Sequence, residues 1–494
     1  MHAQTEHYTY IHGEKKMNLT AFVTKKTAFT YLIIFCILAL LLPAAIRYAS
    51  FGSIIPMEDE SFYNLRLSEN ILEKNDNFVV PVTYIESNPY HILIYSIKFL
   101  GLNATTSSFL VGIILGMLSV ILYYMIMGRF NLPLHHKFFS MLFLVLSPVF
   151  IYTFSVFNKY TFIIFLQLLG FFLLTKQKTR YLSLIPYFIL PFFGIFHALI
   201  SLAIVITYDT FMKKKYLLSG ILFTVTLLIT LFYSMPHYFK YGFDLTTPHL
   251  QNIFQLYVSD LGTMLGFGLF ALVLFTFGVI ATFKEKYSNK YLALYLLLIS
   301  LLILSYFYHE YVIYLNLILM IFSGIGFLFL VKIKWEHKFI RNFAIFIILL
   351  GILFSGVSHI NRLSFSYPHQ DHLDAAEWIK ANAPVDSVIF SHPSNGHFIQ
   401  YAAERKVLLD SSLDRTDSLD KFLGITDDII YSRSLKETKQ HMIDNNIAYV
   451  FIDERMKKGL VWDRDEQGLL FILNNAPDFE KVFSNKEVEI WQLK

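Results

Sequence analysis

The chain has 494 residues, of which 55% are hydrophobic and 16% are charged, and its formal net charge is +4. Soluble domains carry about 25% charged residues, so this composition excludes a protein that is soluble along its whole length. The single cysteine, Cys36, excludes an intramolecular disulfide. Long apolar runs lie within residues 1–360, whereas residues 361–494 have the composition of a soluble domain.

The first apolar run begins at Thr27. It is longer than the core of a signal peptide, so it predicts a retained spanning helix preceded by a cytoplasmic tail, residues 1–26. About eleven segments approach the length of about 20 apolar residues that a spanning helix needs. We interpret residues 181–212 as two short helices, because Pro186 and Pro191 would break a single long one. The predicted spans lie near residues 27–48, 105–127, 138–157, 159–175, 181–195, 197–212, 216–234, 261–283, 291–307, 311–331 and 340–358.

The basic residues between these segments all fall on one side of the predicted membrane. The clusters are Lys15, Lys16, Lys25 and Lys26; Arg129 and Lys137; Lys176, Lys178 and Arg180; Lys213, Lys214 and Lys215; Lys284, Lys286 and Lys290; and Lys332, Lys334, Lys338 and Arg341. Because basic loops stay inside, the N-terminus is predicted to be cytoplasmic and residues 361–494 extracytoplasmic. The long loops 49–104 and 235–260 then lie on the same outer side. We expect a multi-pass protein of the cell membrane, or of the endoplasmic reticulum membrane in a eukaryote.

Three consecutive carboxylates, Glu58, Asp59 and Glu60, stand just outside the first predicted span. Like charges packed together raise one another's pKa or require a cation. A helical segment here places Glu60 and Asn64 on the same face. The alternative interpretation is a solvated acidic turn beside the membrane.

The segment from Glu60 to Arg66 resembles the first-loop motif of oligosaccharyltransferase catalytic subunits. That motif has a carboxylate, two residues, an aromatic, Asn or His, one residue and Arg, and it is matched here by Glu60, Tyr63, Asn64 and Arg66. Protein O-mannosyltransferases, which belong to the same GT-C class of membrane glycosyltransferases, carry an Asp-Glu pair like Asp59-Glu60. The resemblance implies that Glu60, with Asp59 as the close second, is a catalytic carboxylate. It also implies donor or acceptor contacts for Tyr63, Asn64 and Arg66.

A second segment, Val258-Ser259-Asp260, resembles the Ser-Val-Ser-Glu motif in the last large outer loop of the same subunits. By this resemblance Asp260 faces the same cavity as Glu60. A metal ion between the two carboxylates would be Mg²⁺ or Mn²⁺, which prefer oxygen ligands. The alternative is that Asp260 caps the N-terminus of the next helix.

The chain departs from the family pattern in the turn Phe157-Asn158-Lys159, where the family has an acidic pair. Lys159 is a candidate for binding the donor phosphate, or else a residue that holds its helix at the membrane surface. His309 and Glu310 stand where the family often has an arginine facing the donor phosphate, and they are further binding candidates. An interfacial polar turn explains them equally well. His197 is interpreted as a hydrogen-bonded structural residue.

Residues 361–494 alternate predicted helices and strands, which is typical of a small α/β domain. The helices are predicted at 371–381, 396–404 and about 434–446, and the strands at 387–391, 406–410, 448–453 and in a hairpin over 480–490. His392-Pro393-Ser394-Asn395-Gly396 stands where oligosaccharyltransferases have Trp-Trp-Asp-Tyr-Gly, and only Gly396 matches. The residues that read an acceptor sequon are missing, so Asn395 is a candidate for a different acceptor pocket. The alternative is a plain strand-to-helix turn.

The sequence therefore predicts a mainly α, polytopic, GT-C-like membrane protein with a C-terminal α/β extracytoplasmic domain. Its expected activity is transfer of a sugar or oligosaccharide from a polyprenyl-phosphate-linked donor to a protein or glycan acceptor at the outer face of the lipid bilayer. No nucleic-acid partner is expected. The first alternative is a non-catalytic relative whose outer domain binds a partner or glycan. A transporter is the second, and the sequence shows none of the internal repeats typical of transporters.

Overall fold

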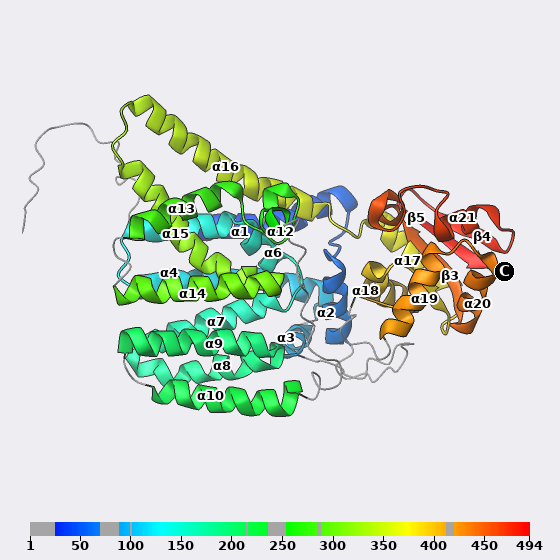
Figure 1. The fold of residues 1–494 in the computed structure, drawn as a ribbon, viewed down its shortest axis with the longest axis horizontal. Helices are drawn as coiled ribbons and strands as arrows, with labels where there is room; N and C mark the ends of the chain where they lie inside the picture. Colours follow the sequence, from blue (N-terminus) through cyan, green and yellow to red (C-terminus); the bar gives the residue numbers. More distant parts are fainter. Residues whose placement is uncertain are drawn as a thin grey trace, which may run out of the picture.

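The computed structural model describes residues 25–69, 88–98, 101–213, 216–235, 253–283, 288–411 and 419–494. Figure 1 shows a bundle of helices beside a soluble α/β domain. The helices α2 (Asp59–Glu69) and α3 (Pro89–Lys98) lie between the two parts. The end of the bundle that faces the soluble domain is called the domain-proximal end below. Residues 1–24 of the predicted tail and residues 236–252 of the second outer loop lie outside the described residues.

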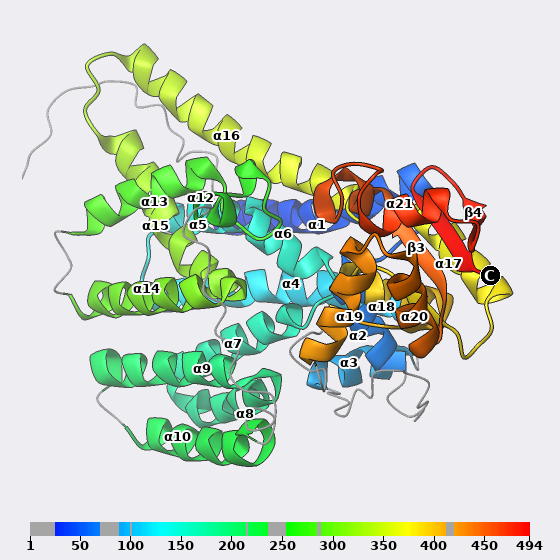
Figure 2. The ribbon, with the colours of Figure 1, turned by 45° about the vertical axis from the view of Figure 1, so that its right-hand side comes forward.

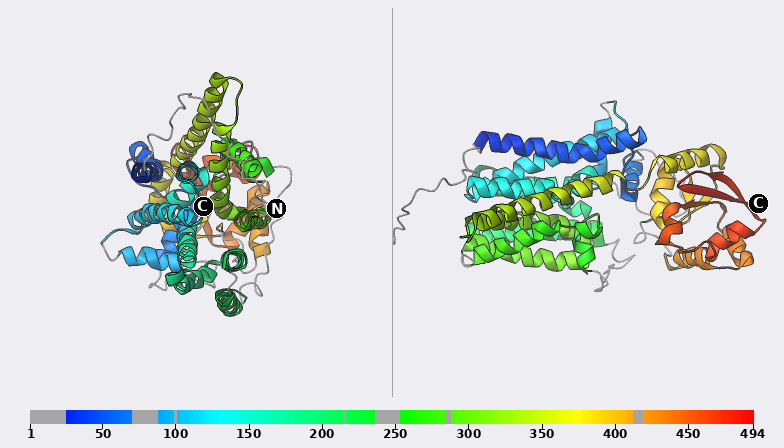
Figure 3. Two further views of the ribbon diagram at one scale, coloured as in Figure 1. Left: turned by 90° about the vertical axis from the view of Figure 1, so that its left-hand side faces the viewer. Right: turned by 90° about the horizontal axis from the view of Figure 1, so that it is seen from above.

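The bundle consists of apolar helices that run between the domain-proximal end and the opposite end (Figures 1 and 3). Within the described residues, five helices are long and apolar enough to cross a membrane, and one bent pair adds a sixth. The five are α1 (Lys25–Phe51), α4 (Ala104–Arg129), α9 (Ile195–Tyr208) together with its continuation to Met212, α15 (Val312–Lys332) and α16 (Lys338–Ser364), and the bent pair is α5 (Leu134–Leu146) with α6 (Pro148–Ser155). Shorter apolar helices are α7 (Tyr160–Thr175), α10 (Leu217–Ile229), α13 (Leu269–Thr282) and α14 (Asn289–Phe307). The count of about eleven spans stays a prediction.

One predicted span is interrupted, and two neighbouring predicted spans are separated at a glycine. The span predicted near residues 138–157 is broken into α5 and α6, which meet at 58°. At the break, the Ser147 hydroxyl accepts hydrogen bonds from the Phe150 amide (3.2 Å) and from the Asn316 side chain (2.9 Å). The hydroxyl thus replaces a helical partner that the break removes. Residues 181–212 are divided at Gly194, whose φ of 136° separates short helical turns, including α8 (Leu184–Ile189), from α9. The division into two elements was predicted.

The helices α13 and α15 pack with their backbones in contact. The Ser323 hydroxyl donates to the Ala271 carbonyl at 2.9 Å, and Gly278 and Gly326 lie where any side chain would overlap the facing backbone. Small residues allow such close approach between helices in a membrane. This contact fixes α15, whose first turn follows the His309–Tyr311 turn at the domain-proximal end.

The soluble domain is a five-stranded sheet flanked by helices (Figures 1 and 2). The strand order is β2-β1-β3-β5-β4, in which β2, β1 and β3 are parallel and the last two pairings are antiparallel. The strands are β1 (Val388–Phe390), β2 (Lys406–Val407), β3 (Ile447–Asp453), β4 (Phe479–Ser484) and β5 (Val488–Leu493). The helices are α17 (Gln370–Asn382), α18 (Gly396–Phe398), α19 (Leu419–Tyr431), α20 (Leu435–Asp444) and α21 (Gly468–Asn475). Helices α19 and α21 are not among the elements predicted from sequence.

Helix α2 belongs to both parts of the molecule. Its Phe62 ring packs against Phe398 with ring centres 5.2 Å apart and is part of the hydrophobic core of the soluble domain. On the opposite side, Asn64 Nδ2 donates to the Phe157 carbonyl in the turn between α6 and α7 at 2.9 Å. The position of α2 is therefore set by the bundle and the soluble domain together.

Arg47 joins the chain segments at the domain-proximal end. It lies near the end of α1, is fully buried, and donates hydrogen bonds to backbone carbonyls of residues 55–56 and of residues 364–368. A guanidinium can satisfy several carbonyls at once because it has five donors in a fixed geometry. Arg47 thus links the segment that leads to α2 with the linker that enters the soluble domain.

Candidate functional site

The start of α2 directs three consecutive carboxylates to three different surroundings. Glu58 adopts a left-handed conformation (φ 65°) and accepts the first helical hydrogen bond from Ser61. Asp59 and Glu60 form the first turn, where negative charge is favoured by the helix dipole. Successive residues of a helix are rotated by about 100°, so neighbouring side chains leave the helix in different directions.

Glu58 points toward Arg455 of the soluble domain and Arg47 near the end of α1. Its carboxylate interacts with Arg455, the Ser366 hydroxyl and Arg47. Burial nevertheless raises the pKa of Glu58, because the loss of water outweighs these favourable contacts.

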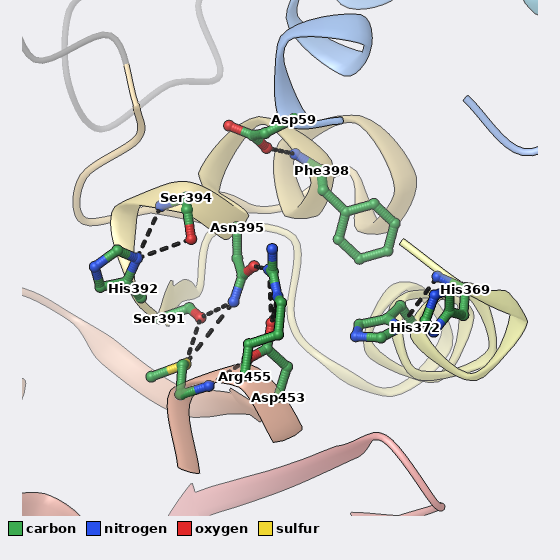
Figure 4. A network of polar contacts seen from close by, with 11 residues as sticks. Asp59, His369, His372, Ser391, His392, Ser394, Asn395, Phe398, Asp453 and Arg455 are labelled. Carbon is green, nitrogen blue, oxygen red and sulfur yellow. Dashed lines mark hydrogen bonds and ion pairs between the residues drawn. The ribbon is translucent and has the colours of Figure 1, made fainter. Parts of the chain in front are cut away.

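Asp59 points into the soluble domain (Figure 4). Its carboxylate accepts hydrogen bonds from the Phe398 amide (3.0 Å) and from the Ser411 hydroxyl (2.6 Å). Burial raises the pKa of Asp59 to about 7; the two hydrogen bonds and Arg66 oppose the rise, and Asp410 adds to it. Asp59 therefore connects α2 to the loops that follow β1 and β2.

Glu60 points toward the bundle. It interacts electrostatically with the phenols of Tyr90, Tyr152 and Tyr160. Glu310, from the turn before α15, acts on the same Tyr160. The structure therefore brings Glu60 and Glu310 to one tyrosine at the domain-proximal end. Tyr152 and Tyr160 are missing from the sequence-based candidates, because aromatic residues in apolar segments read as ordinary packing.

Asn64 is fully engaged in structural hydrogen bonds. Its amide nitrogen donates to the carbonyls of Glu60 and Phe157, both at 2.9 Å, and its oxygen accepts from His91 Nε2 at 2.9 Å. His91 is held in this tautomer because its Nδ1 accepts from the Asn88 amide. Asn64 thus fixes the turn of α2 that carries Glu60.

Tyr63 and Arg66 lie on the other face of α2, toward the soluble domain. The Tyr63 ring lies 4.9 Å from the ring of His397, and the Arg66 guanidinium lies 5.9 Å from the Tyr63 ring centre. Arg66 interacts with Asp410 and Asp59, and burial lowers its pKa. The residues of the first-loop motif are thus divided between two faces of one helix.

An apolar cavity of about 580 Å³ lies within the bundle, between α4, α7, α9, α14 and α15. Its lining extends from Phe196 to Met212 along α9 and its continuation, and from Tyr291 to Phe307 along α14. At about 1.5 Å per residue, each stretch measures about 24 Å, most of the ~30 Å hydrocarbon thickness of a bilayer. The shape and the apolar lining fit a long aliphatic chain that runs across the membrane.

Polar side chains stand at the domain-proximal end of this cavity. Tyr314, which lines the cavity, is hydrogen-bonded to His197 Nδ1 at 3.0 Å. His197 interacts electrostatically with Lys159, whose Nζ lies 5.6 Å from the centre of the Tyr160 ring. Lys159 therefore lies beside the tyrosine on which Glu60 and Glu310 act, and it interacts with the histidine that is bonded to the cavity-lining Tyr314.

Asp260 and His309 hold the segment that precedes α13. Asp260 accepts hydrogen bonds from the Leu269 amide (2.7 Å) and the Ser355 hydroxyl (2.6 Å), one on each oxygen. His309 Nε2 donates to the Leu265 carbonyl at 2.7 Å. Asp260 thus accepts from the first amide of α13, although the N-cap residue of that helix is Gly268 and not Asp260 as the alternative interpretation proposed.

The described side chains do not fit the metal site expected from sequence. Across residues 25–494, leaving out the undescribed gaps, no group of three or more His, Cys, Asp and Glu side chains is arranged to bind a metal ion. Both oxygens of Asp260 are already hydrogen-bonded to protein groups. The Mg²⁺ or Mn²⁺ expected between Glu60 and Asp260 does not match these surroundings.

In the soluble domain, Asn395 belongs to a buried network at the carboxyl ends of β1 and β3 (Figure 4). Its nitrogen donates to the Ser391 hydroxyl at 3.0 Å, and its oxygen accepts from Arg455. Arg455 also donates to Asp453 at 2.7 Å, and its guanidinium stacks 3.5 Å from the Tyr367 ring centre. The side chain of Asn395 therefore supports the loop between β1 and α18.

The arrangement of an apolar bundle, a short acidic helix and an appended α/β domain is that of the GT-C class of membrane glycosyltransferases, and the chain has this fold. The sequence itself matches no protein-family profile and no curated protein.

Three solved structures illustrate the similarity. The oligosaccharyltransferase of Archaeoglobus fulgidus, tethered to an acceptor peptide with an NVT sequon, has a TM-score of 0.59 at 11% identity, over 88% of this chain and 70% of that chain. ArnT of Cupriavidus metallidurans, bound to undecaprenyl phosphate, has a TM-score of 0.57 at 11% identity, over 94% and 98%. The mycobacterial arabinofuranosyltransferase AftD has a TM-score of 0.60 at 14% identity, over 94% of this chain and 40% of that chain. At these identities the likeness defines the fold.

Proposed function

We propose that this chain is a membrane glycosyltransferase. It transfers a sugar from a polyprenyl-phosphate-linked donor to a protein or glycan acceptor at the domain-proximal face, the predicted outer face. The observation that carries the proposal is a carboxylate, Glu60, that interacts with Tyr160 at the domain-proximal end of a bundle containing a long apolar cavity. The cavity suits the lipid tail, and ArnT, which shares the fold, is bound to undecaprenyl phosphate.

Glu60 is the proposed general base. The acceptor oxygen attacks the anomeric carbon of the donor sugar, and a new carbon–oxygen bond forms while the bond to the phosphate oxygen breaks. The electron pair of the broken bond remains on the lipid phosphate, and the acceptor proton passes to Glu60. The configuration at the anomeric carbon is inverted. Glu310, which acts on the same Tyr160, is the proposed partner that positions the sugar.

Asp59 is assigned a positioning role. Its carboxylate accepts two hydrogen bonds from the soluble domain and is turned away from the tyrosines that surround Glu60. Tyr63 and Arg66 lie on the same side as Asp59, where they face His397 and Asp410. We assign the acceptor to this side of α2, between the bundle and the soluble domain.

The test is sugar transfer by membranes that contain the full chain, with labelled polyprenyl-linked sugars. Removing a general base typically costs about 10²–10⁴ in rate, so Glu60→Gln is expected to lower transfer by that amount. Glu69→Gln is the matched control, because Glu69 lies on the same helix and contacts Tyr401 of the soluble domain. Equal transfer by Glu60→Gln and the unchanged protein would refute the proposed chemistry and favour a binding protein.

A further inference from the structure

We propose that the donor carries one phosphate group, so that its sugar is joined to the lipid by a single phosphodiester, and that Lys159 binds this group. The inference rests on the proposed function and narrows its substrate class. It follows from the charges that the structure places at the polar end of the apolar cavity.

Lys159 is positioned for a lipid headgroup. It is half-buried and stands just before α7, next to Tyr160. Through His197 it is connected to Tyr314, which lines the cavity. Within the described part of the chain, Lys159 forms no ion pair. A phosphate on a lipid that fills the cavity therefore emerges beside this ammonium group.

The described arginines near the polar end of the cavity interact with other groups. Each donates to, or interacts with, named groups away from the cavity: Arg47 with backbone carbonyls, Arg66 with Asp59 and Asp410, Arg362 with Ser259, and Arg455 with Asp453 and Asn395. Because these arginines interact with groups away from the cavity, we assign the donor phosphate to Lys159.

One cation matches one negative charge. A sugar phosphodiester carries a single charge, whereas a sugar diphosphate carries two. The second charge would be placed near Glu60 and Glu310, which act on Tyr160 beside Lys159. Charges of the same sign at short range in a partly dry site repel strongly. The site therefore favours the donor with one phosphate.

Lys159 also stabilises the leaving phosphate during the reaction. When the bond between the anomeric carbon and the phosphate oxygen breaks, the electron pair stays on that oxygen, and the lipid phosphate gains a second negative charge. Lys159 is close to this developing charge and stabilises it. Its removal should therefore lower kcat as well as weaken donor binding.

The experiment compares two probes of equal chain length in competition for the full-length protein in lipid nanodiscs: the methyl ester of a polyprenyl monophosphate, which carries one negative charge like the donor, and the methyl ester of a polyprenyl diphosphate, which carries two. We expect the monophosphate probe to bind about tenfold tighter than the diphosphate probe, or more, because the diphosphate carries one additional charge that the site compensates poorly. Lys159→Met should remove this preference and weaken monophosphate binding, and Lys159→Arg should restore part of it. Lys332→Met, at the opposite end of α15, is the control and should change neither value.

Tighter binding of the diphosphate, or unchanged binding by Lys159→Met, would overturn this inference while leaving the effect of Glu60→Gln on transfer intact. Failure of both probes to bind, together with absence of transfer from every lipid-linked sugar, would instead reject the proposed function. The two failures are therefore distinguishable.

Discussion

Gly396 is a position where one methyl group should uncouple α2 from the soluble domain. Its backbone has ordinary helical angles, φ −62° and ψ −52°, so alanine is allowed there by conformation. A Cβ at this position would lie 2.5 Å from the Cα of Asp410 and 3.0 Å from the Leu409 carbonyl oxygen. The neighbouring backbone must therefore move. The segment that moves carries Asp410 and leads to Ser411, which donates to Asp59.

The cost can be estimated from the overlap. Adding a methyl to a well-packed site that cannot yield costs about 1–3 kcal/mol, and close contact with the backbone of two successive residues places Gly396→Ala near the upper part, about 2–3 kcal/mol. For a domain of this size, that loss lowers the melting temperature by roughly 6–15 °C. Gly424 is the matched control, because it lies exposed within α19 and a Cβ there meets nothing within 4 Å. Gly424→Ala should raise stability by up to about 1 kcal/mol through helix propensity.

Tryptophan fluorescence during heating is the appropriate assay, because Trp378, Trp462 and Trp491 lie in the soluble domain and only Trp335 lies in the bundle region. The full chain in detergent is compared with the two alanine variants. A downward shift for Gly396→Ala and an upward or absent shift for Gly424→Ala are expected. If both variants shift in the same direction, the close contact between α18 and the end of β2 is not a determinant of stability.

Three further predictions follow from the contacts around α2. Arg47→Met leaves several buried carbonyls without a donor, each costing about 1–3 kcal/mol, so gel filtration in detergent should show aggregated protein, and Arg47→Lys should restore only part of the folded fraction. The pKa of Asp59 is about 7 in the folded state instead of 3.8, so between these pH values the folded protein retains a proton that the unfolded chain releases. The stability of the wild type relative to Asp59→Asn should therefore fall as pH rises from about 4 to 7 and stay constant above pH 7. Melting curves of both proteins at several pH values would measure this difference. A parallel pH dependence of the two proteins would contradict this assignment. Asn64→Leu removes the hydrogen bonds that join Asn64 to Glu60, Phe157 and His91. It should reduce sugar transfer about tenfold or more with little change in lipid binding. Equal losses of sugar transfer and of lipid binding would indicate general misfolding.

The local elements of the soluble domain are predictable because their signals are local. The amphipathic pattern before Ala383 predicts α17, and alternating residues on both sides of Ser484 to Lys486 predict the hairpin of β4 and β5. Helix α19 begins directly after undescribed residues, and its charged and apolar residues give no equally plain boundary. The kink between α5 and α6 depends on Ser147 and on Asn316, which is far away in sequence, and so it escapes a reading of apolar runs.

The sequence predicts which residues form the candidate site, but it does not predict which way each side chain points. The acidic cluster before Phe62 points to a functional loop, yet no sequence pattern tells which carboxylate turns toward the bundle. That choice follows from packing, since Phe62 enters the core of the soluble domain and thereby sets the rotation of α2. Arg47 and the tyrosines near Glu60 are likewise defined by contacts between distant segments. Burial of the cavity by five helices is a tertiary property that no single segment encodes.

Because α2 packs against both the bundle and the soluble domain, the two parts of the molecule cannot be separated without loss of contacts. A soluble domain that was cut away at the linker would lose Phe62 from its interior and would present the Phe398 ring and amide to water. Recombination between relatives would therefore succeed only when the short acidic helix travels with the appended domain, although more than 300 residues separate them in the chain. Segments that look separable along the sequence are, in this molecule, packed into one unit.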